Sequence, residues 1–385
     1  MNRDSASALA VGVAVVVLIA GFGFYFNSPE LNSKASAGPG EIIPAGTANI
    51  AKTHADKSQF KQAPELAGIS NYINSQPFKL ADLKGKVVLV DFWTYSCINC
   101  IRTIPYLNAW YEKYADHGLV IVGVSTPEFD FEKNPENVQA AVEKFGIKYP
   151  VVQDNDRGTW NAYQNRYWPH KFLVDDEGFV RYDHIGEGSY EETEQVIQSL
   201  LQERAANLGQ NATINASSSS TTTTPVKPEG AQSVDFGRIN TPELYFGYKF
   251  ARANLGNPEG FDPGKVVKYT LPDDVDDIQP NIIYLSGDWL NNPDSMELKS
   301  HTGRIVLEYS AKSVNIVAGG AGKAYVSEDG HAVGPDRGAD VNENNIADIS
   351  GQRLYNLATH GGYARHTLVI DVVGEGFTVY TFTFG

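Results

Sequence analysis

The spacing of hydrophobic residues changes along this chain and divides it into stretches of different character. Between residues 64 and 205, near-continuous apolar runs at 87–93 and 119–124 alternate with segments of helical spacing such as 101–114. Such apolar runs are typical of strands buried on both faces of a sheet. The alternation of strands and helices predicts an α/β fold with a mostly parallel sheet.

From residue 241 to residue 385, short alternating runs replace the long apolar ones. These runs lie at 266–271, 303–309, 313–317, 366–372 and 377–384, separated by clusters of Gly, Asp and Asn. The pattern is typical of an all-β sandwich, which we expect to be a jelly roll.

Residues 6–26 are apolar and uncharged, a length of roughly 20 residues that is sufficient to cross a bilayer. Four aromatic side chains gather at the end of this run, where an interfacial belt would lie. We therefore expect a single N-terminal transmembrane helix in the cell membrane, with the rest of the chain extracytoplasmic. The alternative is a signal peptide cleaved near Ala35-Ser36-Ala37, which would give a secreted protein.

Together these patterns predict a chain of five segments. They are a membrane anchor (1–27), a spacer (28–62), an α/β domain (63–205), a Ser/Thr-rich linker (206–232) and a β-sandwich domain (233–385). The linker is too polar to bury a core and carries two N-glycosylation sequons, at Asn211 and Asn215.

The composition of the chain argues against several classes of function. A net charge of -15 argues against nucleic-acid binding, which needs clustered Lys and Arg. The eight His are scattered without a zinc-type spacing. Residues 340–344 resemble the start of a calcium loop, but Asn345 and Gly351 replace the Gly and the Glu that such a loop requires. The sequence therefore predicts neither a metal site nor a cofactor.

Cys97 and Cys100 are the only cysteines of the chain. A disulfide across so short a loop stabilises a fold little, and two thiols cannot complete a four-cysteine zinc site. The remaining interpretations are a dithiol that cycles between redox states, or an inert local pair. Cys97 lies where a buried strand turns into a helix, so free N–H groups and the helix dipole favour its thiolate. We therefore expect Cys97 to attack and the shielded Cys100 to resolve.

Residues 90–93 followed by Cys97-Ile98-Asn99-Cys100 resemble the thioredoxin superfamily, and residues 125–154 resemble the insertion of its TlpA/ResA and redoxin branches. This resemblance implies that Pro169 is a cis-proline that packs against the dithiol. It also implies that Asp91 is a buried carboxylate that assists proton transfer at Cys100. The alternative for Asp91 is a solvated side chain at a strand end.

Segments 92–102, 125–129, 165–169 and 186–188 resemble the extracytoplasmic part of DipZ-type proteins, which joins a thioredoxin-like domain to a carbohydrate-binding-module-like β-sandwich. The resemblance implies that Trp93, Trp168 and Glu128 help to dock substrate, and Glu128 is also an alternative acid. DipZ proteins carry a multi-helix electron-carrying membrane domain, whereas this sequence predicts a single span. We therefore expect a separate membrane electron donor of the CcdA or DsbD type.

The resulting prediction is a tethered thiol-disulfide oxidoreductase that reduces disulfide-containing proteins, with the β-sandwich as a docking module or a module for a glycan or cell-surface ligand. One alternative is a thiol peroxidase, because Thr94 precedes Cys97 by three residues as in peroxiredoxins, although Val90 replaces their Pro. The other is a surface binding protein in which aromatics such as Trp289 and Tyr269 stack on sugars, although sandwich cores need aromatics too.

Overall fold

The computed structural model describes residues 57–209, 226–228, 231–273 and 277–385. The predicted membrane anchor, both sequons and most of the predicted spacer and linker lie outside these residues. Within the described ranges, no helix combines the length and the apolar character needed to cross a membrane.

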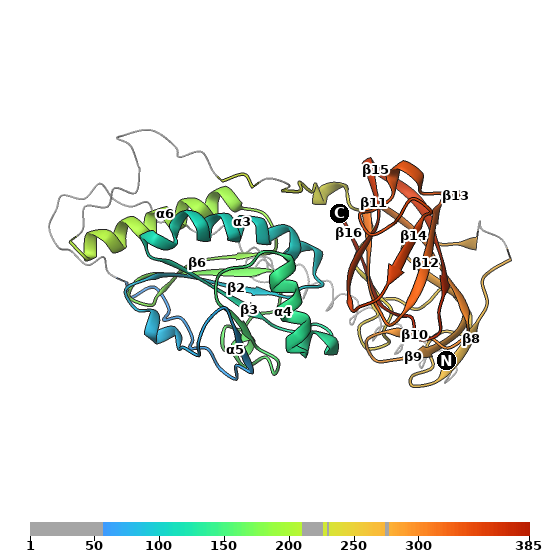
Figure 1. Cartoon of the computed structure of the whole chain (residues 1–385), viewed down its shortest axis with the longest axis horizontal. Helices are drawn as coiled ribbons and strands as arrows, with labels where there is room; N and C mark the ends of the chain where they lie inside the picture. Colours follow the sequence, from blue (N-terminus) through green and yellow to red (C-terminus); the bar gives the residue numbers. More distant parts are fainter. Residues whose placement is uncertain (1–56, 210–225, 229–230, 274–276) are drawn as a thin grey trace, which may run out of the picture. The chain divides into compact units, whose positions relative to one another are not determined.

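Residues 57–209 form what we call the α/β region (Figure 1). Its strands are β1 (Asn71–Ile73), β2 (Val87–Trp93), β3 (Leu119–Ser125), β4 (Val151–Gln153), β5 (His170–Val174) and β6 (Val180–Ile185). Its α-helices are α3 (Ile98–Tyr114), α4 (Pro135–Lys144), α5 (Gly158–Ala162) and α6 (Tyr190–Asn207).

The sheet of the α/β region has the strand order β1-β4-β3-β2-β5-β6. β2, β3 and β4 are parallel, whereas β1, β5 and β6 pair antiparallel to their neighbours. The prediction of a mostly parallel sheet is therefore wrong. β5 and β6 form a hairpin, and Asp175 Oδ1 closes its turn by accepting the N–H groups of Glu177 (3.1 Å) and Phe179 (2.9 Å). Strands joined by so short a turn are antiparallel.

Strand β2 is buried along its whole length, as its apolar run predicts. Its alternate side chains enter two cores. Val87 and Leu89 pack with side chains of α3, α4 and α6, whereas Val88 and Val90 share the second core with Trp160 of α5. Figure 1 shows α3 and α6 side by side over the sheet. β2 is thus the central strand that leads directly into the dithiol.

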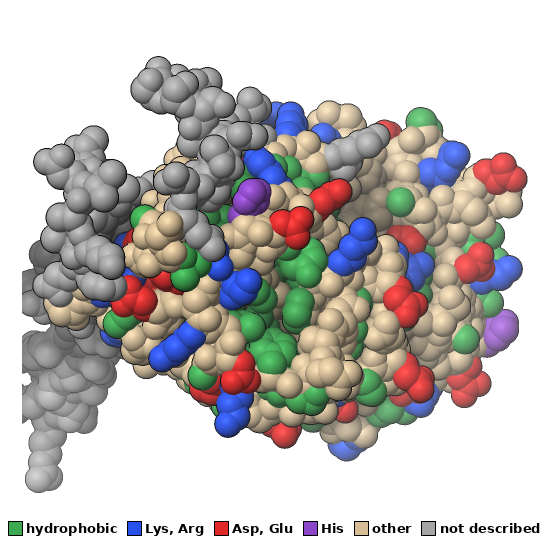
Figure 2. Space-filling view, turned by 60° about the vertical axis from the view of Figure 1, so that its left-hand side comes forward, with side chains coloured by type: hydrophobic (Ala, Val, Ile, Leu, Met, Phe, Trp, Pro, Cys, Tyr) green, Lys and Arg blue, Asp and Glu red, His purple; other side chains and the backbone are tan. Residues whose placement is uncertain are grey.

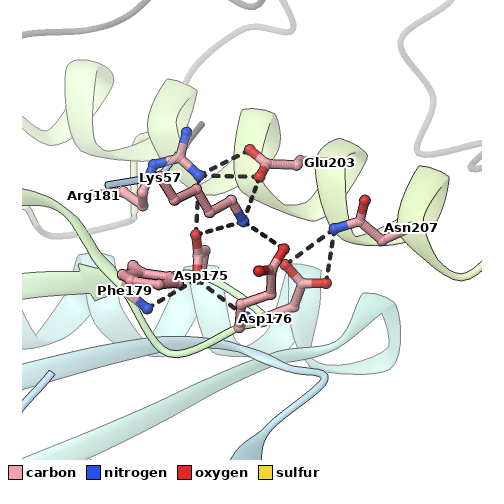
Figure 3. A network of polar contacts seen from close by, with 8 residues as sticks. Lys57, Asp175, Asp176, Phe179, Arg181, Glu203 and Asn207 are labelled. Carbon is pink, nitrogen blue, oxygen red and sulfur yellow. Dashed lines mark hydrogen bonds and ion pairs between the residues drawn. The ribbon is translucent and has the colours of Figure 1, made fainter. Parts of the chain in front are cut away.

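A buried cation ties the last helix of this region to the β5–β6 hairpin (Figure 3). Lys57 Nζ lies 2.8 Å from Asp175 Oδ2 and 2.8 Å from Glu203 Oε1 of α6, and its side chain is only 7% exposed. Arg181 of β6 joins the same two carboxylates at 3.0 Å. These carboxylates raise the pKa of Lys57 against the opposing effect of burial. The network fixes α6 against the edge of the sheet.

Helix α3 begins three residues earlier than the hydrophobic spacing predicts, at Ile98, and continues through Pro105. The apolar pattern alone could not place this start, because residues 98–100 belong to the dithiol motif and precede the apolar series that begins at Ile101. For the next helix, the sequence Asn134-Pro135-Glu136 predicts a helix start, and the structure confirms it in α4. Asn134 caps α4 by accepting the N–H of Glu136 (2.9 Å), and Pro135 occupies the first turn, where its missing N–H costs nothing.

Residues 231–385 form what we call the β region. Its strands are β7 (Leu244–Tyr245), β8 (Val266–Tyr269), β9 (Ile283–Asn291), β10 (Met296–Leu298), β11 (Thr302–Gly319), β12 (Gly322–Glu328), β13 (His331–Ala332), β14 (Ile346–Ile349), β15 (Arg353–Val373) and β16 (Thr378–Phe384). Eight of these strands are ordered β13-β12-β15-β11-β16-β10-β9-β8, with an extra pairing between β11 and β9. Of the other two, β14 pairs with β12 and β7 pairs with β16.

The prediction of a β-rich C-terminal region is confirmed, but some of its strands are longer than the alternating runs from which we predicted them. The runs at 303–309 and 313–317 belong to one strand, β11, with a register shift between Ala311 and Ser313. Trp289 and Tyr269 are 0% and 2% exposed, and they belong to the core. Their aromatic rings therefore pack the core of the β region and are not available to stack on sugars.

Aromatic contacts join the two regions. The ring of Tyr380 in β16 lies 4.7 Å from that of Phe131 and 5.2 Å from that of Phe129, both in the loop after β3. The Tyr245 hydroxyl donates a hydrogen bond to Glu128 Oε1 in the same loop, at 2.7 Å. The β region therefore supports a loop that lies next to the dithiol.

On the face shown in Figure 2, acidic and basic side chains of the described residues are interspersed, with hydrophobic side chains between them. This face carries no continuous basic patch of the kind that nucleic acid requires. The distribution agrees with the acidic net charge of the chain.

Candidate active site

The two cysteines differ in exposure because they occupy different positions on α3. Cys97 is the N-cap residue and is partly exposed, whereas Cys100 lies in the first turn and is 1% exposed. The backbone N–H of Cys100 donates to Cys97 Sγ at 3.4 Å. Burial raises the pKa of the Cys100 thiol well above its usual value, and the Cys97 thiol adds to this effect. Both cysteines are free, so the site holds a dithiol with one accessible and one shielded sulfur.

Asp91 lies in the middle of β2 and is buried, with 1% of its surface exposed. Among the described residues, no hydrogen-bond donor reaches its Oδ1 atom. Burial raises the pKa of Asp91 to about 7, against the opposing effect of Lys171. The alternative of a solvated Asp91 is therefore excluded, and the carboxyl can gain or lose a proton near neutral pH.

Lys171 is a residue that sequence reasoning did not identify. It pairs in register with Asp91 across β2 and β5 and is completely buried. Its Nζ donates to the carbonyl of Gly186 at 2.9 Å, and burial lowers the pKa of this ammonium. Its one signal in the sequence is a charged residue at the start of the apolar run 171–174. A strand cannot bury a lysine without an acceptor and a nearby charge.

The loop before β5 contains the candidate proline. The Trp168–Pro169 peptide bond is cis, and Pro169 is buried. The Trp168 indole donates to the carbonyl of Thr126 at 3.1 Å and packs on Trp160 with ring centres 4.3 Å apart. Trp93 is 1% exposed, so it lies in the core under the dithiol loop and offers no surface to a substrate.

Glu132 supports the residue that precedes the dithiol, and the sequence held no signal for it. Its carboxylate accepts a hydrogen bond from the hydroxyl of Ser96. The other oxygen accepts the backbone N–H groups of Glu128 (2.6 Å) and Phe129 (3.1 Å). Glu132 is itself buried, with 1% of its surface exposed. It therefore joins the loop after β3 to the loop that carries Cys97.

A buried ion pair holds the first turn of α3. Arg102 Nε lies 2.7 Å from Glu187 Oε2, and the two side chains are 3% and 6% exposed. Arg102 also donates to Oδ1 of Asn99, which lies between the two cysteines, at 2.7 Å. Glu187 lies between two glycines that both adopt positive φ angles, Gly186 (84°) and Gly188 (96°). This tight turn brings the carboxylate back to the helix.

A cavity of about 350 Å³ opens at Cys97. Trp168 and Glu128 line it from the α/β region, and Glu243 and Tyr245 line it from the β region. Burial and the like charges of Glu243 and Glu132 raise the pKa of Glu128 to about 8. Two of the three predicted docking residues, Trp168 and Glu128, thus share one cavity with the exposed thiol, whereas Trp93 does not line it.

Three further side chains able to bind a metal come together far from the dithiol in sequence. They are Glu328, His360 and His366, each of which offers one ligand atom within 4.8 Å of the others. The sequence predicts no metal site, because the six-residue spacing of these histidines matches no zinc motif. By contrast, in the segment 340–344, which resembles the start of a calcium loop, the Asp340 carboxylate is bonded to Arg353 Nη1 (2.7 Å) and to the N–H of Asn356 (2.8 Å).

Comparison with known families divides the chain as its fold does. Residues 61–183 match the AhpC/TSA family, and residues 241–385 match the family described as the thioredoxin-like C-terminal domain.

Two relatives illustrate the similarity. The chain is 36% identical to the DipZ protein of Mycobacterium bovis over 353 residues, which cover 90% of this chain and 46% of DipZ. It thus spans about half the length of DipZ. It is 31% identical to the thiol-disulfide oxidoreductase ResA of Bacillus thuringiensis over 149 residues, which cover 38% of this chain and 82% of ResA.

Among solved structures, the thioredoxin domain of a thiol-disulfide oxidoreductase from Bacteroides vulgatus is 30% identical and covers 36% of this chain and 96% of its own, with a TM-score of 0.31. The similarity to ResA extends over most of that protein. The chain belongs to the thioredoxin-like superfamily of thiol-disulfide oxidoreductases.

Proposed function

We propose that this protein reduces disulfide bonds of extracytoplasmic proteins through Cys97 and Cys100. The observation that carries the proposal is the contrast between the two sulfurs, one partly exposed at a helix N-terminus and one buried a turn away. A nucleophile must reach a substrate, whereas a resolving thiol must be protected from it.

In the proposed reaction the Cys97 thiolate attacks one sulfur of the substrate disulfide. A mixed disulfide forms, and the first substrate sulfur leaves as a thiolate. Cys100 then transfers its proton to Asp91 and attacks the Cys97 sulfur, so the second substrate sulfur leaves. The substrate gains two electrons and takes up two protons, and the protein ends with a Cys97–Cys100 disulfide.

The cavity beside Cys97 suits a segment of polypeptide. Trp168 presents an aromatic face, and Glu128 and Glu243 present oxygens that accept backbone N–H groups. We propose that Trp168, Glu128 and Pro169 dock the chain that carries the substrate disulfide. In this proposal the β region, a jelly-roll sandwich, completes the docking surface, with a glycan or cell-surface ligand as the alternative occupant.

The apolar run at residues 6–26 supports a single-span anchor ahead of the spacer, with domains at 63–205 and 233–385 joined by the polar linker. The proposed cycle leaves the dithiol oxidised, so it needs a reductant. We propose a separate membrane protein of the CcdA or DsbD type as this donor.

Trapping of the mixed disulfide tests the mechanism. Cys100→Ser should accumulate mixed disulfides with a disulfide-containing test protein such as insulin, because the resolving thiol is missing. Cys97→Ser should form none. Adducts through Cys100 in the Cys97→Ser variant would contradict the assignment of the two thiols.

The reduction potential of the dithiol tests the direction of electron flow. A value near or below that of thioredoxin, about -270 mV, is expected for a reductase. A value near that of the oxidant DsbA, about -120 mV, would contradict the proposed direction while leaving the exchange chemistry intact.

A thiol peroxidase is the second candidate, and the match of residues 61–183 to the AhpC/TSA family favours it. A peroxidase would convert the Cys97 thiolate to a sulfenic acid, which Cys100 would condense to a disulfide with loss of water. Consumption of hydrogen peroxide by the reduced protein, compared with the Cys97→Ser variant and with free thiol at equal concentration, separates the two functions.

A further inference from the structure

The β region contains a cluster of three side chains that the dithiol chemistry does not use. We call Glu328 of β12 and His360 and His366 of β15 the His–Glu cluster. Their side chains are 5%, 11% and 17% exposed, so the cluster is shielded but reachable from solvent. Two imidazoles and a carboxylate are a common ligand set for divalent transition metals.

A bulge in β15 assembles the cluster. In a regular strand, residues six positions apart are separated by about 20 Å. In β15 the pairing with β11 jumps from Thr359 to Ala364, which leaves His360, Gly361, Gly362 and Tyr363 outside the ladder. The two imidazole rings consequently stack with their centres 4.0 Å apart and their planes 10° apart. The bulge thus brings together two histidines whose spacing in the sequence matches no zinc motif.

Each histidine is oriented through its Nδ1 atom. His366 Nδ1 lies 2.8 Å from Asp329 Oδ2, and His360 Nδ1 lies 3.6 Å from Asp336 Oδ2. An Nδ1–H directed at a carboxylate leaves the Nε2 lone pair free for a metal, which is the usual arrangement around metal-binding histidines. The backbone N–H of Thr367 fixes Asp329 at 2.8 Å, so this supporting carboxylate is itself held in place.

The carboxylate of Glu328 is also oriented. Its Oε1 accepts the Tyr309 hydroxyl at 2.6 Å, and its Oε2 lies 3.1 Å from His360 Nε2. One ligand atom from each of the three side chains therefore faces the other two. The second polar atom of each side chain contacts a different neighbour: Tyr309, Asp336 or Asp329. A supported ligand of this kind keeps its orientation when a metal arrives.

An ordinary ion pair does not account for the whole arrangement. The contact between Glu328 and His360 would satisfy those two groups, but His366 Nε2 remains buried without a hydrogen-bond partner among the described residues. A buried polar atom without a partner is costly. A metal bound by both imidazoles and the carboxylate would give this nitrogen a ligand.

We propose that Glu328, His360 and His366 bind one zinc ion in the β region, separate from the thiol chemistry. Tetrahedral zinc with bonds of about 2.0 Å holds its ligand atoms about 3.4 Å apart, so atoms now up to 4.8 Å apart must draw together by up to about 1.4 Å. Three protein ligands leave the fourth position open to water or to a ligand carried by a partner.

Zinc titration of the metal-stripped full chain tests the proposal. The chain carries Cys97→Ser and Cys100→Ser, because the dithiol would itself bind zinc. Competition with a chromophoric chelator should give one zinc per chain, and zinc-edge X-ray absorption should report two imidazole ligands. His366→Ala should weaken binding at least 10-fold, and Asp329→Asn, which alters a supporting carboxylate, by about 10- to 100-fold.

Two controls keep the outcome interpretable. His301→Ala removes an exposed histidine outside the cluster and should leave zinc affinity unchanged. Asp329 is 53% exposed, so its conservative variant should fold, and circular dichroism without zinc checks this for every variant. Binding of less than one zinc per chain, a spectrum without imidazole ligands, or wild-type affinity in both His366→Ala and Asp329→Asn would overturn the proposal.

Discussion

At the residue scale, the proposed chemistry depends on the protonation of Asp91. Its pKa of about 7 means that the carboxyl is mostly protonated below neutral pH and cannot then accept the proton of Cys100. The rate of disulfide reduction should therefore rise with pH through about 7 in the wild type. In Asp91→Asn this rise should disappear, and the rate at pH 8 should fall by about 100-fold, the low end for general base catalysis.

The measurement is a pH profile of the second step, the release of reduced substrate from the mixed disulfide. Asp116→Asn changes an exposed carboxylate on the same region and serves as the matched control. A wild-type profile in Asp91→Asn would show that Asp91 is not the proton acceptor, and would leave the roles of the thiols untouched.

Residue types and their order along the chain predict the chemical centre of the site, but not its supports. Cys97 and Cys100 could be identified because they lie close together at a strand-to-helix junction, and a resemblance pointed to Asp91 and Pro169. Lys171 and Glu132 could not, because each acts across the sheet or between loops. Lys171 pairs with Asp91 across the sheet, and Glu132 bonds to Ser96. No local sequence pattern predicts contacts between residues so far apart in the chain.

At the scale of elements, the first turn of α3 depends on the pair between Arg102 and Glu187. Both side chains are almost fully buried, so removing one partner leaves an uncompensated charge in the interior. Arg102→Met should lower the free energy of unfolding by about 3–5 kcal/mol, measured by urea denaturation. The double variant Arg102→Met, Glu187→Met should recover most of this loss, because neither charge remains.

The Lys133–Asp130 pair offers the comparison, because its side chains are 48% and 83% exposed. Lys133→Met should change stability by less than about 1 kcal/mol. Equal losses in Arg102→Met and Lys133→Met would mean that burial does not determine the strength of these pairs.

The elements themselves were predictable where the periodicity is strong. The buried strand at 87–93 and the capped helix after Asn134 follow from local pattern alone. Two features do not. The long strand β11 reads as two runs because of its register shift near Ser313, and the short helix α5 (Gly158–Ala162) is too brief for a 3.6-residue period to appear.

At the scale of the whole molecule, we expect the β region to stabilise the loop beside the dithiol. Tyr380 is 6% exposed and contacts Phe129 and Phe131 across the two regions. Tyr380→Ala removes these ring contacts and should lower the free energy of unfolding by about 3 kcal/mol. Amide hydrogen exchange at residues 128–132, measured by mass spectrometry, should become faster even though the substitution lies in the other region.

Tyr325→Ala provides the matched control, because this tyrosine of the β region is 40% exposed. It should leave exchange at residues 128–132 unchanged. If Tyr380→Ala also leaves it unchanged, the two regions behave independently and the proposed docking role of the β region loses its structural support.

The burial of Asp91 opposite Lys171 has an electrical consequence for the proposed cycle. With Cys100 protonated, the interior below the dithiol holds one negative and one positive group. When Cys100 passes its proton to Asp91, a thiolate replaces the carboxylate, and the sum with Lys171 is still zero. When the disulfide forms, the negative charge leaves with the substrate thiolate, and the sum is +1 until Asp91 releases its proton to solvent and restores zero. Oxidation and reduction can therefore each end with a neutral interior by moving one proton between Asp91 and solvent, without any counter-ion having to enter.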